Sequence, residues 1–416
     1  MKTAAGFLAA RFPFVNELLT RRLLPVVIAA AGLVLATNAA VFSYAVATSK
    51  DYVTPYGPVV GGDFVVFNEA AKAAASGEAA AIYDREVLEA RLKAAFPARE
   101  DFRLSWQYPP TMLVLTAPLA IAPYPSSFVL WTLATGALFL LAMSGVWKNR
   151  VALFLAIASP AAFQALITGQ TGFLTAALVT AAALGPDRRW LLAGLAAGLL
   201  TVKPQLGLLL PVAFLAAGCW RAFAVAAATT LLLAGASHAL FGAEAWTAFL
   251  AALSAHGAEM QSAVFPFHKL VSVYGGAVML GMPISVALAL QLAVSLGLAG
   301  FVALVWRRVK EWDLRLAVLS SAALLVSPYA FYYEMTVALP ALFIIARRGV
   351  ETGWLEGEKP ALALLWLAPM FILAANDGPG FPVAFAATLA TFLLAARRAL
   401  AALPARGEAQ GMAGAR

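Results

Sequence analysis

The chain has 416 residues, of which 62% are hydrophobic and only 12% are charged, with a mean hydropathy of +0.83. A soluble domain carries about 25% charged residues, so the composition excludes a water-soluble fold and predicts an all-α, multi-span protein in the lipid bilayer. The net charge of +8 lies in short basic clusters between apolar runs, which argues against a nucleic-acid partner.

Twelve apolar segments are expected to form transmembrane helices. The first is too long for a secretory signal, whose apolar core is about 7 to 15 residues, and is interpreted as an uncleaved span. Several others fall short of the ~20 residues that a straight crossing needs and are expected to be tilted or broken. The segments are 23–46, 124–147, 151–168, 171–185, 189–203, 205–219, 222–241, 282–306, 315–328, 331–347, 361–376 and 380–398.

The basic clusters that flank these segments fall on one side of the arrangement. The positive-inside rule makes that side cytoplasmic, together with residues 1–22 and the tail 401–416. Residues 47–123 and 242–281 then form two long loops on the outer side. The basic residues that set this topology are Arg21, Arg22, Lys148, Arg150, Arg188, Arg189, Arg221, Arg307, Arg308, Lys310, Arg347, Arg348, Arg397 and Arg398.

The apolar run 109–122 does not fit as a further crossing, because it would place Lys148 and Arg150 outside and invert everything downstream. It is therefore interpreted as a helix that lies in or dips into the outer interface. An amphipathic stretch up to Ala75 and a charged helix up to about Ala95 are also expected in this first outer loop.

Asp63 is the first candidate for chemistry. It follows Gly61 and Gly62, which allow the backbone to approach a ligand closely, and it lies just beyond the first predicted span. A carboxylate there can act as a general base toward a hydroxyl. The alternative is that Asp63 caps the helix that starts at Phe64.

Lys203 is charged yet lies between two apolar runs, and Pro204 follows it. Ionisable residues at such a depth are costly, and an ammonium at the outer end of a span suits a lipid phosphate or pyrophosphate. A lysine that extends to the interface is the alternative. His268 and Lys269, with His256 upstream, suggest a phosphate contact or a solvated loop rather than a metal site.

Further polar residues lie at predicted outer helix ends. Gln170 interrupts two short spans, where it lines a cavity or caps helices, and Tyr329, Tyr333 and Glu334 follow another span. Interfacial tyrosines are common, so Glu334 is the more unusual residue. The single cysteine, Cys219, and the absence of nucleotide-binding, HExxH and GxSxG motifs predict neither a cofactor nor a metal.

An ordered set of motifs resembles glycosyltransferase family 87 over residues of about 25 to 345. The set comprises Asp63 after the first span, Gly77, Tyr83-Asp84, Tyr108-Pro109-Pro110, Pro118-Leu119, Gly169-Gln170, Gly194 with Lys203-Pro204, and Ser327-Pro328-Tyr329. At the position of Tyr333-Glu334, many members of the family carry Asp or His pairs.

The resemblance implies a GT-C fold, with one transmembrane domain over 23–400 and interfacial helices in its first outer loop. It implies a transferase of the inner membrane that uses a polyprenyl-phosphate-linked sugar, typically mannose, on the periplasmic face. Asp63 maps onto the catalytic base of such enzymes. Glycolipids, cell-wall glycans, lipopolysaccharide and proteins all remain possible acceptors.

Asp63 is therefore predicted to take the acceptor proton in an inverting, metal-independent transfer. Lys203, Lys269 and His268 are predicted to bind the donor phosphate. The predicted substrate-binding residues are Gln107, Tyr108, Gln170, Tyr329, Tyr333 and Glu334. A transporter or flippase of lipid-linked sugars is the main alternative, although transporters usually place polar residues near the bilayer midplane and in two related halves. A structural membrane subunit is the third reading.

Overall fold

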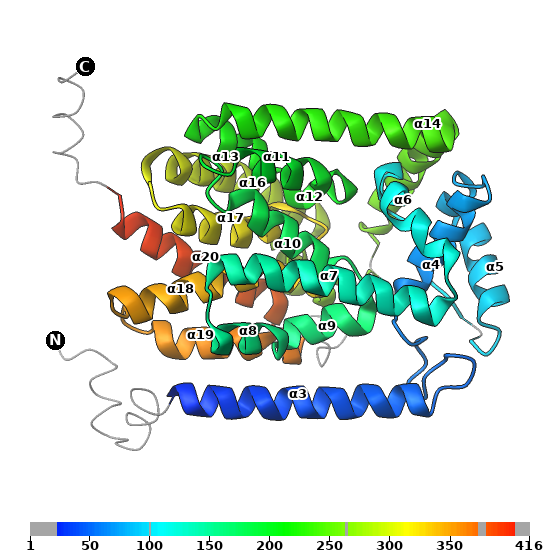
Figure 1. Ribbon diagram of the computed structural model, residues 1–416, viewed down its shortest axis with the longest axis horizontal. Helices are drawn as coiled ribbons and strands as arrows, with labels where there is room; N and C mark the ends of the chain where they lie inside the picture. Colours follow the sequence, from blue (N-terminus) through cyan, green and yellow to red (C-terminus); the bar gives the residue numbers. More distant parts are fainter. Residues whose placement is uncertain (1–22, 100, 263–264, 373–379, 404–416) are drawn as a thin grey trace.

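A computed structural model describes residues 23–99, 101–262, 265–372 and 380–403 (Figure 1). These residues form helices joined by short turns, with isolated β-bridges but no strand among them, which confirms the all-α prediction. The predicted cytoplasmic N-terminus with Arg21 and Arg22 and the tail from residue 404 lie outside the described residues.

The described chain consists of α-helices (α) and short 3-10 helices (η) from its first element to its last. The first half comprises α3 (Leu23–Ala47), α4 (Phe64–Ala75), η2 (Ala81–Tyr83), α5 (Arg85–Ala95), α6 (Pro110–Thr116), η3 (Ala117–Ile121), α7 (Tyr124–Val146), α8 (Arg150–Ile157), α9 (Pro160–Thr168), α10 (Gly172–Ala183), α11 (Trp190–Leu199) and η4 (Leu200–Val202). The second half comprises α12 (Pro204–Gly207), α13 (Leu209–Ala217), α14 (Trp220–Glu259), η5 (Phe267–Lys269), α15 (Val273–Met279), α16 (Ile284–Arg308), α17 (Trp312–Val326), η6 (Tyr332–Ala338), α18 (Leu339–Thr352), α19 (Glu358–Leu367), η7 (Ala368–Phe371) and α20 (Val383–Ala401).

Five of the described helices are long and apolar enough to cross a membrane, namely α3, α7, α14, α16 and α20. The bent pair α8 and α9, whose axes meet at 48°, is a sixth candidate. The other six predicted spans are helical but short. α10, for example, has 12 residues, which at 1.5 Å per residue reach only about 18 Å of the ~30 Å hydrocarbon core. The chain is thus a membrane protein, and twelve full crossings are not confirmed.

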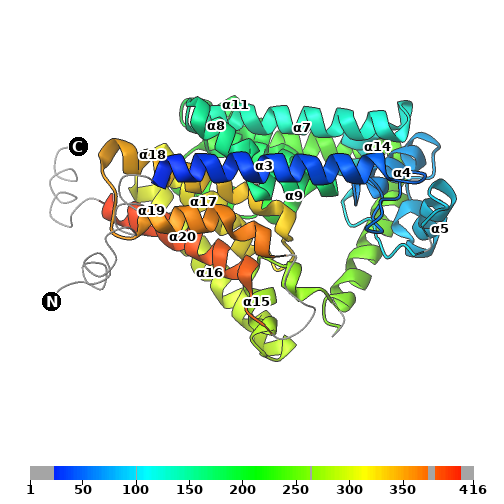
Figure 2. The same ribbon diagram turned by 90° about the horizontal axis from the view of Figure 1, so that it is seen from below.

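The long helices run along the long axis of the molecule, as α3, α7 and α14 do in Figure 1. α17 lies in the interior, with every side chain from Asp313 to Val326 buried. α3 instead lies along the outside of the bundle (Figure 2), and only 6% of its apolar window is buried. A helix so apolar and so exposed requires a lipid environment.

Close packing of α11 against α14 depends on two glycines. A Cβ at Gly194 would lie 2.5 Å from the Cβ of Val225, and one at Gly198 would lie 2.4 Å from the Cβ of Thr229. Small residues four apart let two helix backbones approach in this way. The two glycines therefore allow the close packing of these helices.

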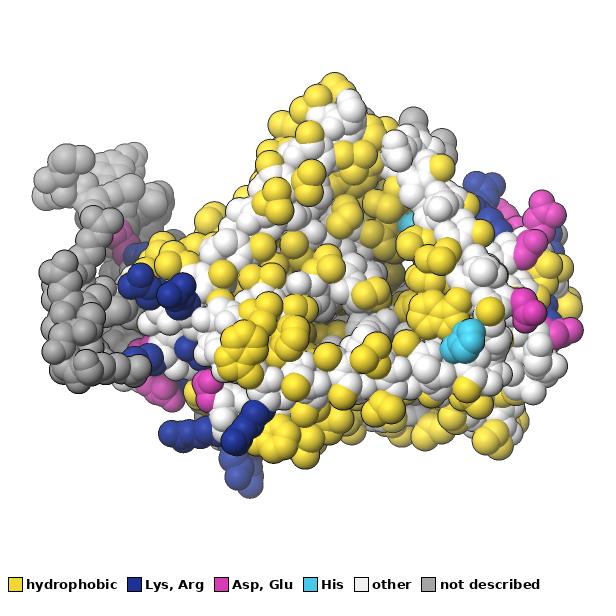
Figure 3. Space-filling model, turned by 90° about the horizontal axis from the view of Figure 1, so that it is seen from above, with side chains coloured by type: hydrophobic (Ala, Val, Ile, Leu, Met, Phe, Trp, Pro, Cys, Tyr) yellow, Lys and Arg dark blue, Asp and Glu magenta, His cyan; other side chains and the backbone are white. Residues whose placement is uncertain are grey.

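Charge separates the two ends of the molecule. In Figure 3 one end carries most of the visible Lys and Arg, the opposite end carries acidic and basic residues together, and the surface between them is largely hydrophobic. At the basic end, Asp313 at the start of α17 binds both Arg347 and Arg348 of α18. Arg347 also donates to the carbonyl of Val146, where α7 ends. Basic clusters far apart in sequence therefore meet at one end.

The opposite end differs from the predicted outer loops in one respect. Residues 242–281 were expected to form a long loop; the apolar helix does break at Gly242, which has φ of +75° and ψ of +173°, but a second helix follows and ends at Glu259. α14 therefore consists of two helices, 220–241 and 243–259, which are joined at a kink at Gly242. The segment 109–122 forms the short helices α6 and η3, as predicted.

Candidate active site

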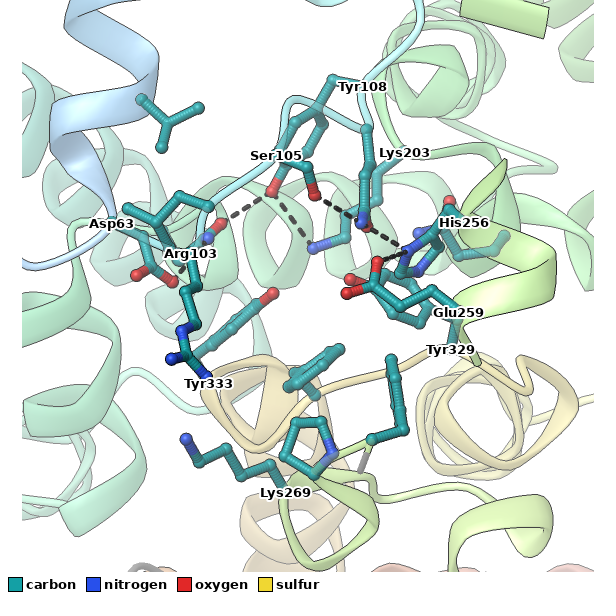
Figure 4. A pocket seen from close by; sticks show the side chains of 18 of the residues that line it. Asp63, Arg103, Ser105, Tyr108, Lys203, His256, Glu259, Lys269, Tyr329 and Tyr333 are labelled. Carbon is teal, nitrogen blue, oxygen red and sulfur yellow. Dashed lines mark hydrogen bonds and ion pairs between the residues drawn. The ribbon is translucent and has the colours of Figure 1, made fainter. Parts of the chain in front are cut away.

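A cavity of about 680 Å³ opens where the first outer loop, the outer part of α14 and the ends of several short helices meet (Figure 4). Eight of the ten predicted site residues line it, and they come from segments far apart in sequence. The eight are Asp63, Gln107, Tyr108, Gln170, Lys203, Lys269, Tyr329 and Tyr333. His268 and Glu334 are buried but do not line this cavity.

Two glycines fix the position of Asp63. Gly61 and Gly62 adopt φ of +88° and +53°, a region that favours glycine. A Cβ on Gly62 would lie 2.9 Å from the carbonyl oxygen of Ile167, and one on Gly169 would lie 2.8 Å from that of Gly61. The glycines were expected to let the backbone approach a ligand. They let it approach the turn between α9 and α10 instead.

Asp63 precedes α4 but does not cap it. Its backbone is already helical, with φ of −73° and ψ of −7°, and its side chain makes no cap hydrogen bond. The carboxylate instead accepts a hydrogen bond of 3.0 Å from Nε2 of Gln170. The alternative interpretation of Asp63 as a helix cap is therefore wrong, and its carboxylate faces the cavity.

Burial raises the pKa of the Asp63 carboxyl above its ordinary range. The hydrogen bond from Gln170 acts against this rise, as do the positive charges of Lys269, Arg99 and Lys203, in that order. A carboxylate with a raised pKa holds a proton more readily than an exposed one. This property suits a general base, whose strength grows with its pKa.

A chain of hydrogen bonds leads from Asp63 to Lys203. Gln170 donates to Asp63, and its carbonyl oxygen accepts a 2.7 Å hydrogen bond from the hydroxyl of Tyr108. The ammonium of Lys203 lies 3.4 Å from that same hydroxyl. The amide of Gln170 has both a donor and an acceptor, so it can donate to the carboxylate and accept from the phenol simultaneously.

Glu334 completes this chain from beneath the cavity. It forms an ion pair with Lys203, in which the two side chains are 0% and 5% exposed. Its second oxygen accepts a 2.7 Å hydrogen bond from Thr175, and Thr171 donates to the first at 3.1 Å. Glu334 was predicted to bind substrate. The geometry does not favour that contact, because the ammonium of Lys203 and the two threonine hydroxyls occupy its carboxylate.

Other parts of the first loop support the cavity wall. The hydroxyl of Tyr83 donates to the carbonyl of Tyr108 at 2.9 Å. Asp84 caps α5 by accepting from the amides of Glu86 and Val87. The Tyr83-Asp84 motif therefore has a structural role, because it holds Tyr108 in place and starts the helix that follows.

Sequence reasoning did not select His256 as a site residue. It lies on the unexpected continuation of α14, is 8% exposed and lines the cavity. Its Nδ1 lies 2.6 Å from Nε2 of Gln107 and 3.3 Å from a carboxylate oxygen of Glu259, which also pairs with Arg85. The histidine was assigned to a loop, whereas residues 243–259 form a helix after the kink at Gly242.

Arg103 also lines the cavity and was not predicted to do so. It lies in the irregular segment that precedes Gln107, where several charged residues occur and none stands out in sequence. As for metals, the described part of the chain brings no three His, Cys, Asp or Glu residues close enough together to hold an ion.

The comparisons with known proteins identify the family. The model of glycosyltransferase family 87 matches residues 106–328, more than half of the chain. The matched region includes Tyr108, Gln170 and Lys203, whereas Asp63 precedes it. No match was found to a curated protein or to a solved structure. The chain therefore belongs to glycosyltransferase family 87, as its ordered motifs predict.

Proposed function

We propose that the protein transfers a sugar, with mannose as the first candidate, from a polyprenyl-phosphate donor to a hydroxyl of a lipid or glycan acceptor. The family supports a glycosyltransferase, and the single observation that carries the mechanism is the Asp63 carboxylate. It is half-buried, makes no helix-cap hydrogen bond and faces a cavity large enough for a sugar. Asp63 is accordingly the proposed catalytic base.

The proposed reaction is a direct displacement. As the acceptor oxygen attacks the anomeric carbon, its proton passes to the carboxylate of Asp63. The bond between the anomeric carbon and the phosphate oxygen breaks, and its electron pair leaves with the polyprenyl phosphate. A single displacement inverts the anomeric centre, and no step requires a metal or a cofactor.

Gln170 and Tyr108 set the orientation of the base. The amide of Gln170 donates to one oxygen of Asp63. The other oxygen is then available to accept the proton of the substrate hydroxyl that is to be glycosylated. The hydroxyl of Tyr108 holds the Gln170 amide in the orientation that donates. A fixed carboxylate needs little rearrangement before the proton moves, which lowers the barrier.

The distribution of charge supports an orientation for the cavity. The end where α18 lies in Figure 1 carries most of the visible Lys and Arg in Figure 3, and the positive-inside rule places that end in the cytoplasm. The cavity lies at the other end, so it is proposed to face the periplasm of the inner membrane, with both termini cytoplasmic. We further infer that the six shorter helices complete one GT-C-type bundle over 23–400.

Sugar transfer from synthetic polyprenyl-phosphate mannose tests this proposal. Purified wild type and Asp63→Asn are compared with a panel of acceptors from membrane extracts, and thermal unfolding in detergent checks that both are folded. We expect transfer by the wild type and at least a 100-fold loss in Asp63→Asn, typical of a lost general base. Equal transfer by both proteins would remove Asp63 from the mechanism.

A further inference from the structure

Lys203 was predicted from the sequence to bind the donor phosphate. The ammonium of Lys203 has three N–H donors. Within the described residues they are directed at Glu334, at Oγ1 of Thr171 (3.1 Å) and at the hydroxyl of Tyr108 (3.4 Å). Because Glu334 also neutralises its charge, Lys203 has neither a spare donor nor a net charge to offer an anion.

Arg103 differs from Lys203 in both respects. Its side chain is 81% exposed and lines the cavity, so it lies at the mouth rather than in the interior. Among the described residues its one hydrogen bond runs from Nε to Asp101, at 3.1 Å, and Asp101 is itself 69% exposed. The four N–H groups on the two terminal nitrogens of the guanidinium are not used in this contact.

Lys269 is the second cation on this side of the cavity. In the view of Figure 4 the charged ends of Arg103 and Lys269 lie on the same side of the cavity as Asp63. Lys269 is also the charge that lowers the pKa of Asp63 most strongly, ahead of Arg99 and Lys203. No hydrogen bond or ion pair joins Lys269 to another described side chain.

The backbone holds Lys269 at the cavity. η5 ends at Lys269, and the amide of Val271 donates to the carbonyl of Ala330 at 2.9 Å, next to a β-bridge between Leu270 and Phe331. These contacts tie the lysine to the stretch that contributes Tyr329 and Tyr333 to the same wall. Its position is therefore set by the fold.

We propose that Arg103 and Lys269 together bind the phosphate of the lipid-linked donor, at the mouth of the cavity and beside Asp63. A guanidinium binds phosphate oxygens in a bidentate manner, and an ammonium adds a point charge. Lys203 then has a different role, because it holds Tyr108 and, through it, Gln170. This inference rests on the proposed function, since it concerns the donor of that reaction.

The negative charge on the donor phosphate increases during the proposed reaction, and two cations stabilise that increase. The donor phosphate is a diester with one negative charge, and it becomes a monoester with close to two when the bond to the sugar breaks. Two cations therefore interact more strongly with the leaving group than with the intact donor. Interactions that strengthen toward the transition state raise the rate of transfer.

Binding of isoprenyl phosphate, the reaction product, tests the site without requiring turnover. Titration calorimetry in detergent compares the wild type with Arg103→Gln, Lys269→Gln and a control, Lys93→Gln, which removes one positive charge from α5 away from the cavity. We expect each site variant to bind about 10- to 100-fold more weakly, as for a lost hydrogen bond to a charged group. The control binds as the wild type does.

Two further ligands test the specificity of the site. Isoprenol, which lacks the phosphate, should bind all four proteins equally weakly, and inorganic phosphate should not compete at equal concentration. Competition by inorganic phosphate would mean that the site takes a soluble anion, which overturns the assignment to a lipid donor. Melting temperatures close to that of the wild type show that each variant is folded.

The outcomes separate this inference from the proposed function. If the wild type binds isoprenyl phosphate and transfers sugar while both site variants bind it equally well, the cation pair is refuted and the transferase stands. If the wild type neither binds isoprenyl phosphate nor transfers from any polyprenyl-phosphate donor, the proposed function fails and the pair fails with it.

Discussion

Gln170→Glu is the most informative substitution in this cavity, because it changes the charge beside the proposed base with almost no change in shape. Nε2 of Gln170 lies 3.0 Å from Oδ2 of Asp63. The substitution replaces that donor with a second carboxylate oxygen. Two carboxylates at this distance cannot both ionise easily, and they titrate as a pair that shares a proton.

The size of the effect follows from the distance. Two unit charges about 4 Å apart interact with about 4 kcal/mol at an effective dielectric constant of 20. That energy corresponds to roughly three pKa units. Because the two groups can share one proton, the observed shift should be smaller, at least about one unit. A base acts only when deprotonated, so a raised pKa moves the acidic limb of the rate to higher pH.

The assay is the pH profile of kcat/KM for the wild type, Gln170→Glu and Gln170→Met. Methionine removes the N–H donor without adding charge, and loss of that hydrogen bond alone also raises the pKa of Asp63. We therefore expect the acidic limb to move upward in both variants, and further in Gln170→Glu. Coincident limbs for the three proteins would refute the assignment of the limb to Asp63.

Three further predictions concern stability and metal. Glu334→Gln leaves the charge of Lys203 buried without a counterion and should cost about 3–5 kcal/mol in the free energy of unfolding, while the double variant Lys203→Met/Glu334→Met should recover most of it; thermal unfolding in detergent measures both. Gly169→Ala places a Cβ 2.5 Å from the Cβ of Phe64 at φ of +56°, whereas Gly77→Ala at φ of +80° meets nothing within 4 Å, so the melting temperature should fall further for Gly169→Ala; equal falls would contradict the proposed contact. Transfer should be unchanged by EDTA, and loss of activity with rescue by a divalent ion would show a metal requirement.

Much of the fold could be predicted from apolar runs and their basic flanks. The segments that became α3, α7, α16 and α20 are long and continuous, with no charged residue before the last two positions of each predicted segment, and their predicted ends are within three residues of the observed ones. The short helices were harder, because their boundaries depend on tertiary contacts. The apolar run of α14 breaks at Gly242, as a glycine after a long apolar run predicts, but a second helix follows the break and ends at Glu259.

The site could be predicted as a set of residues but not as a network. Asp63, Gln170 and Lys203 are conspicuous in sequence because each interrupts or follows an apolar run. Nothing in their spacing shows that Gln170 bonds to Asp63 or that Glu334 neutralises Lys203, since these pairs are separated by 107 and 131 residues. Arg103 has no local signal at all, and only the cavity identifies it.

The contact between Gly61-Gly62 and the turn at Gly169 has a consequence for exchanging parts between relatives. The base and the amide that orients it belong to different segments, yet the glycine contacts join their backbones within van der Waals distance. A first outer loop transplanted alone would bring its own Asp but not the matching turn. Chimeras that carry residues 61–64 and 167–171 together should keep activity, and those that divide the two segments should lose it.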